Sequence, residues 1–170
     1  MRPQDVVILL KILILEDKEW QYRDLSVSLN ISISEISESL HRSHMAGLVD
    51  ESRKKIYRKS LMEFIEFGLH YVFPQFPGSM VTGFATAHSH PFYKSKLVSE
   101  VNYVWPDTNG DLRGLAIEPL FKGVIKAALQ DELLYKLLAS IDIIRVGRTR
   151  ELKIAVNELH KIILNEPLGK

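Results

Sequence analysis

A short basic run is the part of this chain best suited to binding an anionic polymer. Between His41 and Ser60 there are six Lys or Arg residues against two Asp or Glu residues. Guanidinium and ammonium groups neutralise phosphates and release their counterions. The whole chain has a formal net charge of only +1, so any affinity for nucleic acid must come from this local patch. The run comprises Arg53, Lys54, Lys55, Arg58 and Lys59.

A second charged cluster lies towards the C-terminus, in the sequence IDIIRVGRTRELKIA. Arg145, Arg148 and Arg150 could bind an anion there, either a phosphate or an acidic patch on a partner protein. In the structural alternative, Asp142 pairs with one of the arginines and Glu151 forms an ion pair on the last helix. We favour the structural alternative, although three arginines in six residues exceed what one helix cap requires.

Two imidazoles stand close together in His88-Ser89-His90. Ordinary zinc sites need three or four ligands, and no acidic residue or third histidine lies nearby in sequence. We therefore expect loop histidines that hydrogen-bond locally, with no metal and no cofactor. A ligand or metal sensor that uses His88 and His90 is kept as an alternative.

Other catalytic and targeting signals are missing from the sequence. It contains no glycine-rich phosphate loop, nucleophile elbow or paired-carboxylate motif, so we do not expect an enzyme. There are no cysteines, which excludes disulfides and thiolate sites and fits a cytoplasmic protein. The apolar run Val6–Leu15 is interrupted by Lys11 and is too short to span a bilayer, so we expect a buried first helix and no membrane association.

The basic run follows three expected helices, over residues 3–17, residues 22–29 and residues 33 to about 46. Asn30 stands where the chain must turn sharply, and asparagine tolerates the left-handed conformation. Ser32 and Glu35 form a capping box at the start of the third helix, and Gly47 is suited to end it. The inward face of this helix is expected to carry Ile33, Ile36, Leu40 and Met45.

Beyond residue 47 the sequence predicts a two-stranded β-wing over residues 48–59. Ser60 and Glu63 predict the start of a helix that runs to about Phe73. Residues 74–93 have the proline and glycine content of a linker but carry large apolar side chains, so we expect an ordered linker or extended arm on a surface. Further on, the sequence predicts β-strands within 96–105 and 112–117, then helices at about 119–129, 131–141 and 147–164.

Three positions match the spacing of a helix-turn-helix: Ser26, Asn30 and Ile36. A small residue lets the two helices cross closely, the turn residue accepts an unusual backbone angle, and a β-branched residue fills the space between the helices. With a leading helix and a basic wing in the right order, residues 1–73 resemble the winged helix-turn-helix domains of bacterial and archaeal transcriptional regulators, broadly of the MarR-like type.

The resemblance implies binding to double-stranded DNA, with the second helix of the motif in the major groove and the wing on the backbone. It implies that Ser32 and Ser34 donate to phosphates and that Arg42 reaches a phosphate or guanine. Glu38 would either accept from cytosine or repel the anionic DNA. The DNA-binding residues that it implies are Ser32, Ser34, Ser37, Glu38, His41 and Arg42 on the helix, with Arg53, Lys54, Lys55 and Arg58 on the wing.

These observations predict a mainly α fold with a small β-wing, in which a winged helix-turn-helix (1–73) is followed by a linker (74–93) and a mostly helical region for dimerisation or partner binding (94–170). The expected function is that of a homodimeric, cytoplasmic transcriptional regulator on a palindromic operator. The main alternative is an antitoxin or accessory subunit that binds a partner protein through residues 74–170 and autoregulates its operon.

Overall fold

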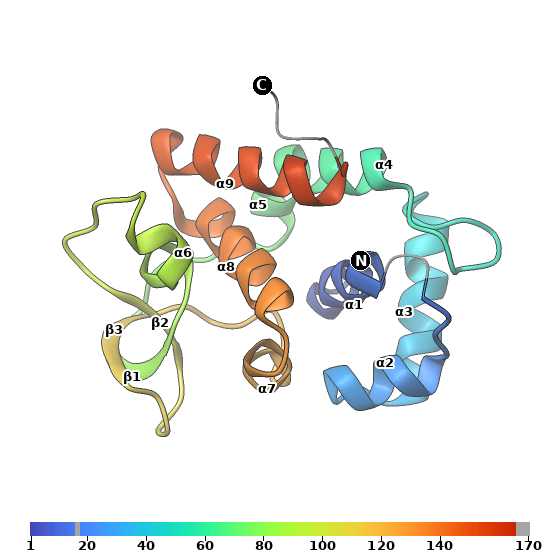
Figure 1. The fold of residues 1–170 in the computed structure, drawn as a ribbon, viewed down its shortest axis with the longest axis horizontal. Helices are drawn as coiled ribbons and strands as arrows, with labels where there is room; N and C mark the ends of the chain where they lie inside the picture. Colours follow the sequence, from blue (N-terminus) through green and yellow to red (C-terminus); the bar gives the residue numbers. More distant parts are fainter. Residues whose placement is uncertain (16–17, 166–170) are drawn as a thin grey trace.

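The computed structural model describes residues 1–15 and 18–165 and shows a mainly helical protein with a small three-stranded mixed sheet (Figure 1). In Figure 1 the first three helices lie at one end of the molecule and the sheet at the other, with α8 between them. The helices are α1 (Pro3–Leu15), α2 (Tyr22–Leu29), α3 (Ile33–Met45), α4 (Arg58–Glu63), α5 (Leu69–Val72), α6 (Pro91–Lys94), α7 (Val124–Leu129), α8 (Glu132–Val146) and α9 (Thr149–Ile163).

Helix α1 is the centre of the core, as its apolar sequence predicts. Every side chain from Val6 to Leu10 is fully buried, and the helix packs against α2, α3 and α8 of the same chain. The chain itself therefore covers these residues. The predicted end of the helix at residue 17 lies outside the described residues.

The turn between α2 and α3 is built as the sequence predicts. Asn30 adopts the left-handed conformation (φ 55°, ψ 44°), and the Ser32 hydroxyl accepts a hydrogen bond of 3.2 Å from the Glu35 amide. Gly47 follows the end of α3 with a φ of 72°, a conformation that favours glycine. The buried face of α3 is shorter than expected. Ile33 is 50% exposed and Met45 is 73% exposed, so the prediction that these two side chains point inward is wrong.

The wing is reduced to one bridge, between Val49 and Ile56, in place of two full strands. The Asp50 carboxylate closes the loop by accepting from the amides of Lys54 and Lys55 at 3.1 and 3.0 Å. These backbone hydrogen bonds, that from Lys55 first, lower the pKa of Asp50. We call residues 50–55 the wing tip.

The helix after the wing starts three residues earlier than predicted, with Tyr57 in place of Ser60 as the residue before it. Helix α4 begins at Arg58, so Ser60 lies inside the helix and does not cap it. A π-helical turn, η1 (Phe64–Gly68), joins α4 to α5, which ends close to the predicted Phe73.

Part of the segment predicted as a linker is a strand. Strand β1 (Met80–Ala85) pairs antiparallel with β2 (Tyr103–Pro106) and with β3 (Leu112–Ala116), while β2 and β3 pair in parallel. Each strand therefore has both others as neighbours. The ring is tight enough that a Cβ on Gly83 would lie 2.0 Å from the Trp105 carbonyl oxygen. Of the predicted 96–105 strand, only its last residues belong to β2.

The three C-terminal helices are present as predicted, but α7 begins five residues later than predicted and α8 ends five residues later. Asp131 caps α8 by accepting from the Leu134 amide at 3.0 Å, and its carboxylate also pairs with Lys11 of α1 at 2.7 Å. This contact links the C-terminal helices to the first helix. Among the described helices, none combines the length and hydropathy needed to cross a bilayer.

Candidate nucleic-acid interface

The outer face of α3 carries most of the helix residues proposed from the sequence. Ser34, Glu38 and His41 are exposed, and Ser37 is half-buried. The Ser32 hydroxyl is exposed but already accepts from Glu35 and lies 3.1 Å from the Ser34 hydroxyl. This face therefore offers hydroxyl, carboxylate and imidazole groups to solvent.

Arg42 lies beside this face, but its guanidinium is bound to carboxylates of the protein. Its guanidinium bonds both oxygens of Asp5, which is fully buried on α1, at 2.7 and 3.0 Å, and it also pairs with Glu35 at 2.5 Å. Burial opposes ionisation of Asp5, but the hydrogen bonds from Arg42 and the Arg2 amide hold the pKa of this carboxyl below its ordinary value. The guanidinium that the resemblance assigned to DNA thus fastens α3 to α1.

The wing tip meets α3 at Arg53. One guanidinium nitrogen of Arg53 lies 3.3 Å from His41 Nδ1, and Arg53 has a φ of 59°. A hollow of about 430 Å³ opens between the two elements and is lined by Ser37, Glu38, His41, Arg42 and Arg53. The outer face of α3 and the wing tip consequently form one continuous polar surface.

Lys54 is held against the loop before α2. Its ammonium lies 3.9 Å from the centre of the Trp20 ring and donates to the Trp20 carbonyl at 2.6 Å. Such a cation–π contact is worth about 0.5–1 kcal/mol at an exposed site. No sequence pattern indicated this pairing, because Trp20 precedes the predicted motif. Lys54 therefore fixes the wing to the body of the domain.

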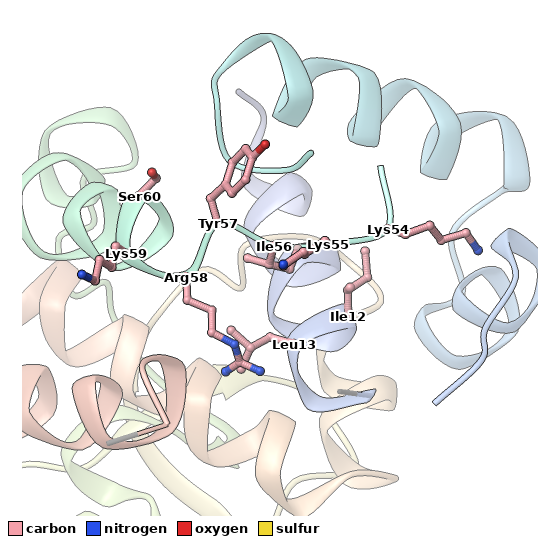
Figure 2. A pocket seen from close by; sticks show the side chains of 9 residues that line it. All are labelled: Ile12, Leu13, Lys54, Lys55, Ile56, Tyr57, Arg58, Lys59 and Ser60. Carbon is pink, nitrogen blue, oxygen red and sulfur yellow. The ribbon is translucent and has the colours of Figure 1, made fainter. Parts of the chain in front are cut away.

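A basic cavity of about 710 Å³ lies on the other side of the wing, between α1 and the start of α4 (Figure 2). Ile12, Leu13 and Ile56 supply its apolar lining, and Lys54 and Lys59 extend away from each other in Figure 2. Arg58 donates to the carbonyl of Ile163 at 2.8 Å, at the last residue of α9. The basic run is thus spread over several directions, and Arg58 ties α4 to α9.

The three C-terminal arginines do not act as one group. Arg145 is 5% exposed and donates to Asp142 at 2.9 Å, to the carbonyls of Phe73 and Glu118, and to Gln75. Burial raises the pKa of Asp142, and the Arg145 charge opposes this. The predicted pairing of Asp142 with an arginine is confirmed.

The other two arginines, Arg148 and Arg150, are exposed. Glu151 accepts from the Arg148 amide at 3.1 Å, which is a helix cap and not the predicted ion pair. The cluster seen in the sequence therefore divides into one buried structural arginine and two at the surface.

The two histidines of the 74–93 segment are both buried. His90 Nδ1 accepts from the Phe92 amide at 3.3 Å, which confirms the predicted local hydrogen bond, and burial together with Lys136 lowers the pKa of His90 to about 4. His88 makes no such bond through Nδ1, which is buried. Within 1–15 and 18–165, no three His, Cys, Asp or Glu residues are grouped so that they could hold a metal.

Comparison with known protein families, curated proteins and solved structures found no match to this chain. The function is therefore argued from the geometry above. One signal in the sequence could have revealed the internal role of Arg42. Asp5 opens an apolar helix, and a carboxylate in such a place needs a buried partner.

Proposed function

We propose that this chain is a homodimeric transcriptional regulator that binds double-stranded DNA in the manner of a winged helix-turn-helix. In this proposal α3 enters the major groove and the wing tip contacts the backbone. The observation that carries it is the contact between Arg53 and His41, which joins the wing tip to the exposed face of α3.

The exposed side chains of α3 can read bases in several ways. His41 and Ser37 can hydrogen-bond to base edges, and Glu38 can accept from the amino group of cytosine. Ile33 is 50% exposed at the start of the helix, where an apolar group can contact the methyl group of thymine. None of these four side chains is part of the buried core, so each is available to contact a base.

Few cations are left for the phosphates. Arg42, Lys54 and Arg58 are engaged within the protein, which leaves Arg53 and Lys55 at the wing tip. Because each phosphate contact contributes a slope of about −0.9 to the salt dependence of binding, a single copy should bind weakly. Two copies bound to one operator would together make more phosphate contacts and so compensate for the weak binding of a single copy.

The test is binding to the DNA upstream of its own gene, measured over a salt titration with the Arg53→Ala/Lys55→Ala double variant. We expect weaker binding and a reduction of the salt slope by about two for each bound copy. The matched control is Lys94→Ala/Lys153→Ala, which removes the same charge from exposed sites on α6 and α9 and should leave the slope unchanged. An equal effect of the two double variants, or no effect of either, would overturn the proposal.

The proposed dimer would use the outer side of η1 and α5. Phe67 is 68% exposed and Tyr71 is 81% exposed, although large aromatic groups usually lie against a partner or the core. We expect Phe67→Ser/Tyr71→Ser to convert a dimer into a monomer by light scattering after size exclusion, with Lys161→Ser on α9 as a control. A dimer that persists in the double variant would contradict this interface.

A second candidate is an antitoxin or accessory subunit with a protein partner. Phe76 is 84% exposed and lies in the chain just before β1, where Met80 is 47% exposed. An exposed aromatic in an irregular segment is suited to lie along another protein. Purification of the chain from its own cells would test this, and recovery of the chain alone would count against a stable partner.

A further inference from the structure

The basic cavity behind the wing carries charges of one sign only. It measures about 710 Å³ and lies between α1, the wing and the start of α4 (Figure 2). Its lining contains no carboxylate and four cationic side chains, which are Lys54, Lys55, Arg58 and Lys59. A hollow lined by charges of one sign attracts ions of the opposite sign.

The described part of the chain supplies no counter-charge to these groups. Outside the wing and the start of α4, every described lysine or arginine that is not exposed pairs with a carboxylate; these residues are Lys11, Arg42, Lys136 and Arg145. By contrast, no described carboxylate forms an ion pair with a cation between positions 53 and 59. The positive charge of this cavity is therefore left for an anion from outside the chain.

Arg58 is half-buried in this cavity, and its guanidinium is held in place. The side chain runs from the start of α4 to Leu13 in Figure 2. One nitrogen, Nη1, donates to the carbonyl of Ile163 at 2.8 Å, and the Nε and Nη2 donors have no partner among the described residues. The planar fork formed by Nε and Nη2 matches two oxygens of a carboxylate or a phosphate. Arg58 therefore presents a positioned and unused pair of donors.

The surroundings of Arg58 strengthen its attraction for an anion. Ile12, Leu13 and Ile56 belong to the same lining and are buried, so the guanidinium lies against an apolar wall. Charges beside such a surface are screened less than charges in open water. Lys55 lines the same cavity, and its exposed ammonium has no hydrogen-bond partner among the described residues. It is free to join Arg58 on one anion.

The amount of charge in the lining favours phosphate over carboxylate. A phosphate monoester carries a charge of about −1.5 to −2 at pH 7 and three strong acceptor oxygens, whereas a carboxylate carries a single charge. We propose that this cavity binds the phosphate group of a small phosphorylated molecule, which the fork of Arg58 and the ammonium of Lys55 hold together.

Such a ligand would also act on the wing. Lys55 belongs to the wing tip and is one of the two cations left there for DNA phosphates. A bound phosphate that occupies Lys55 would lower the affinity for DNA, a consequence that rests on the proposed function. The cavity itself lies on the other side of the wing from α3, so binding of the ligand does not require DNA.

The test measures binding of pyrophosphate to the full chain without DNA, by calorimetry at constant ionic strength. We expect saturable binding of about one pyrophosphate per chain, and much weaker binding of acetate, which carries a single charge. Equal binding of acetate, or no saturable binding of pyrophosphate, would overturn the assignment. Either result would leave the proposed DNA binding untouched, because DNA is absent from the measurement.

Three variants locate the site. We expect Arg58→Gln and Lys55→Gln each to weaken pyrophosphate binding by about tenfold, because each removes hydrogen bonds to a charged group. Lys55 is exposed, so Lys55→Gln should leave the melting temperature unchanged even if loss of the bond from Arg58 to Ile163 lowers it. Arg53→Gln is the matched control, because Arg53 is a wing-tip cation outside the lining of this cavity. Equal weakening by Arg53→Gln would show a general charge effect and would contradict the site.

A DNA titration separates a free ligand from a phosphate of the DNA backbone. If DNA supplied the phosphate, Arg58→Gln would reduce the salt slope of DNA binding by about one. We expect Arg58→Gln to leave this slope unchanged and Arg53→Gln to reduce it. A slope reduced by Arg58→Gln would assign the cavity to the DNA backbone and overturn the proposed free ligand.

Discussion

Replacing Arg42 with alanine should lower the free energy of unfolding by about 3–5 kcal/mol, because it leaves the buried carboxylate of Asp5 without its counter-charge. Asp5 is fully buried on α1 and takes two hydrogen bonds from this guanidinium. Urea unfolding at pH 7, followed by circular dichroism, measures the loss. Arg53→Ala is the control, because it removes the same group from the wing tip and should cost under about 0.5 kcal/mol.

The Arg42 effect should depend on pH in a defined direction. The folded-state pKa of Asp5 is lowered, so the ion pair stabilises the fold above the unfolded pKa of about 3.9 and is lost as pH falls through the folded value. The difference between wild type and Arg42→Ala should therefore be largest at neutral pH and shrink as pH falls towards the lowered folded pKa of Asp5 in the wild type. A difference that does not change with pH would contradict the assigned role of Asp5.

Replacing Arg145 with alanine should cost a similar amount, about 3–5 kcal/mol, for a related reason. Its guanidinium joins Asp142 to the carbonyls of Phe73 and Glu118 and to Gln75, so it holds α8 against the segments that precede and follow the sheet. The loss leaves Asp142, which is 2% exposed, with an uncompensated charge. Urea unfolding again gives the size of the effect.

A double-mutant cycle separates the charge from the packing. The second substitution is Asp142→Asn in the Arg145→Ala background, where the side-chain amide oxygen can still accept from Trp105 and Thr86. We expect the double variant to be more stable than Arg145→Ala alone. Arg148→Ala should change stability by under about 0.5 kcal/mol, because Arg148 is exposed. If Arg148→Ala cost as much as Arg145→Ala, the division of the arginine cluster would be wrong.

Local signals in the sequence predicted the helices well. Asn30, Ser32 and Gly47 act through neighbouring backbone, so their effect on α2 and α3 can be read from nearby residues alone. The same reasoning failed at Ser60, because a serine and a glutamate at capping spacing also fit inside a helix. Strand β1 was missed because its pairing partners lie on β2 and β3, far along the chain and beyond any local pattern.

The candidate site was predicted less well than the helices. The positions of Ser34, Glu38 and His41 follow from helical periodicity, and the structure exposes all three. The directions of the long basic side chains depend on distant partners: Asp5 for Arg42, Trp20 for Lys54 and Ile163 for Arg58. Charge counting along the sequence cannot show such pairings, so it overstated the number of basic side chains that are free to bind an anion.

The three-stranded ring limits how other proteins can approach the sheet. A strand at the edge of an open sheet presents free amides and carbonyls that a peptide or an unfolded neighbour can copy. Here β1, β2 and β3 each have both others as neighbours, and Gly83, Val104 and Leu115 are paired on both sides, so the described sheet offers only short open margins for strand addition. Association by β-augmentation is therefore disfavoured at this end of the molecule. A binding partner there would recognise mainly side chains and helix surfaces, and fibril-like growth from the native sheet would have only two- or three-residue margins to start from.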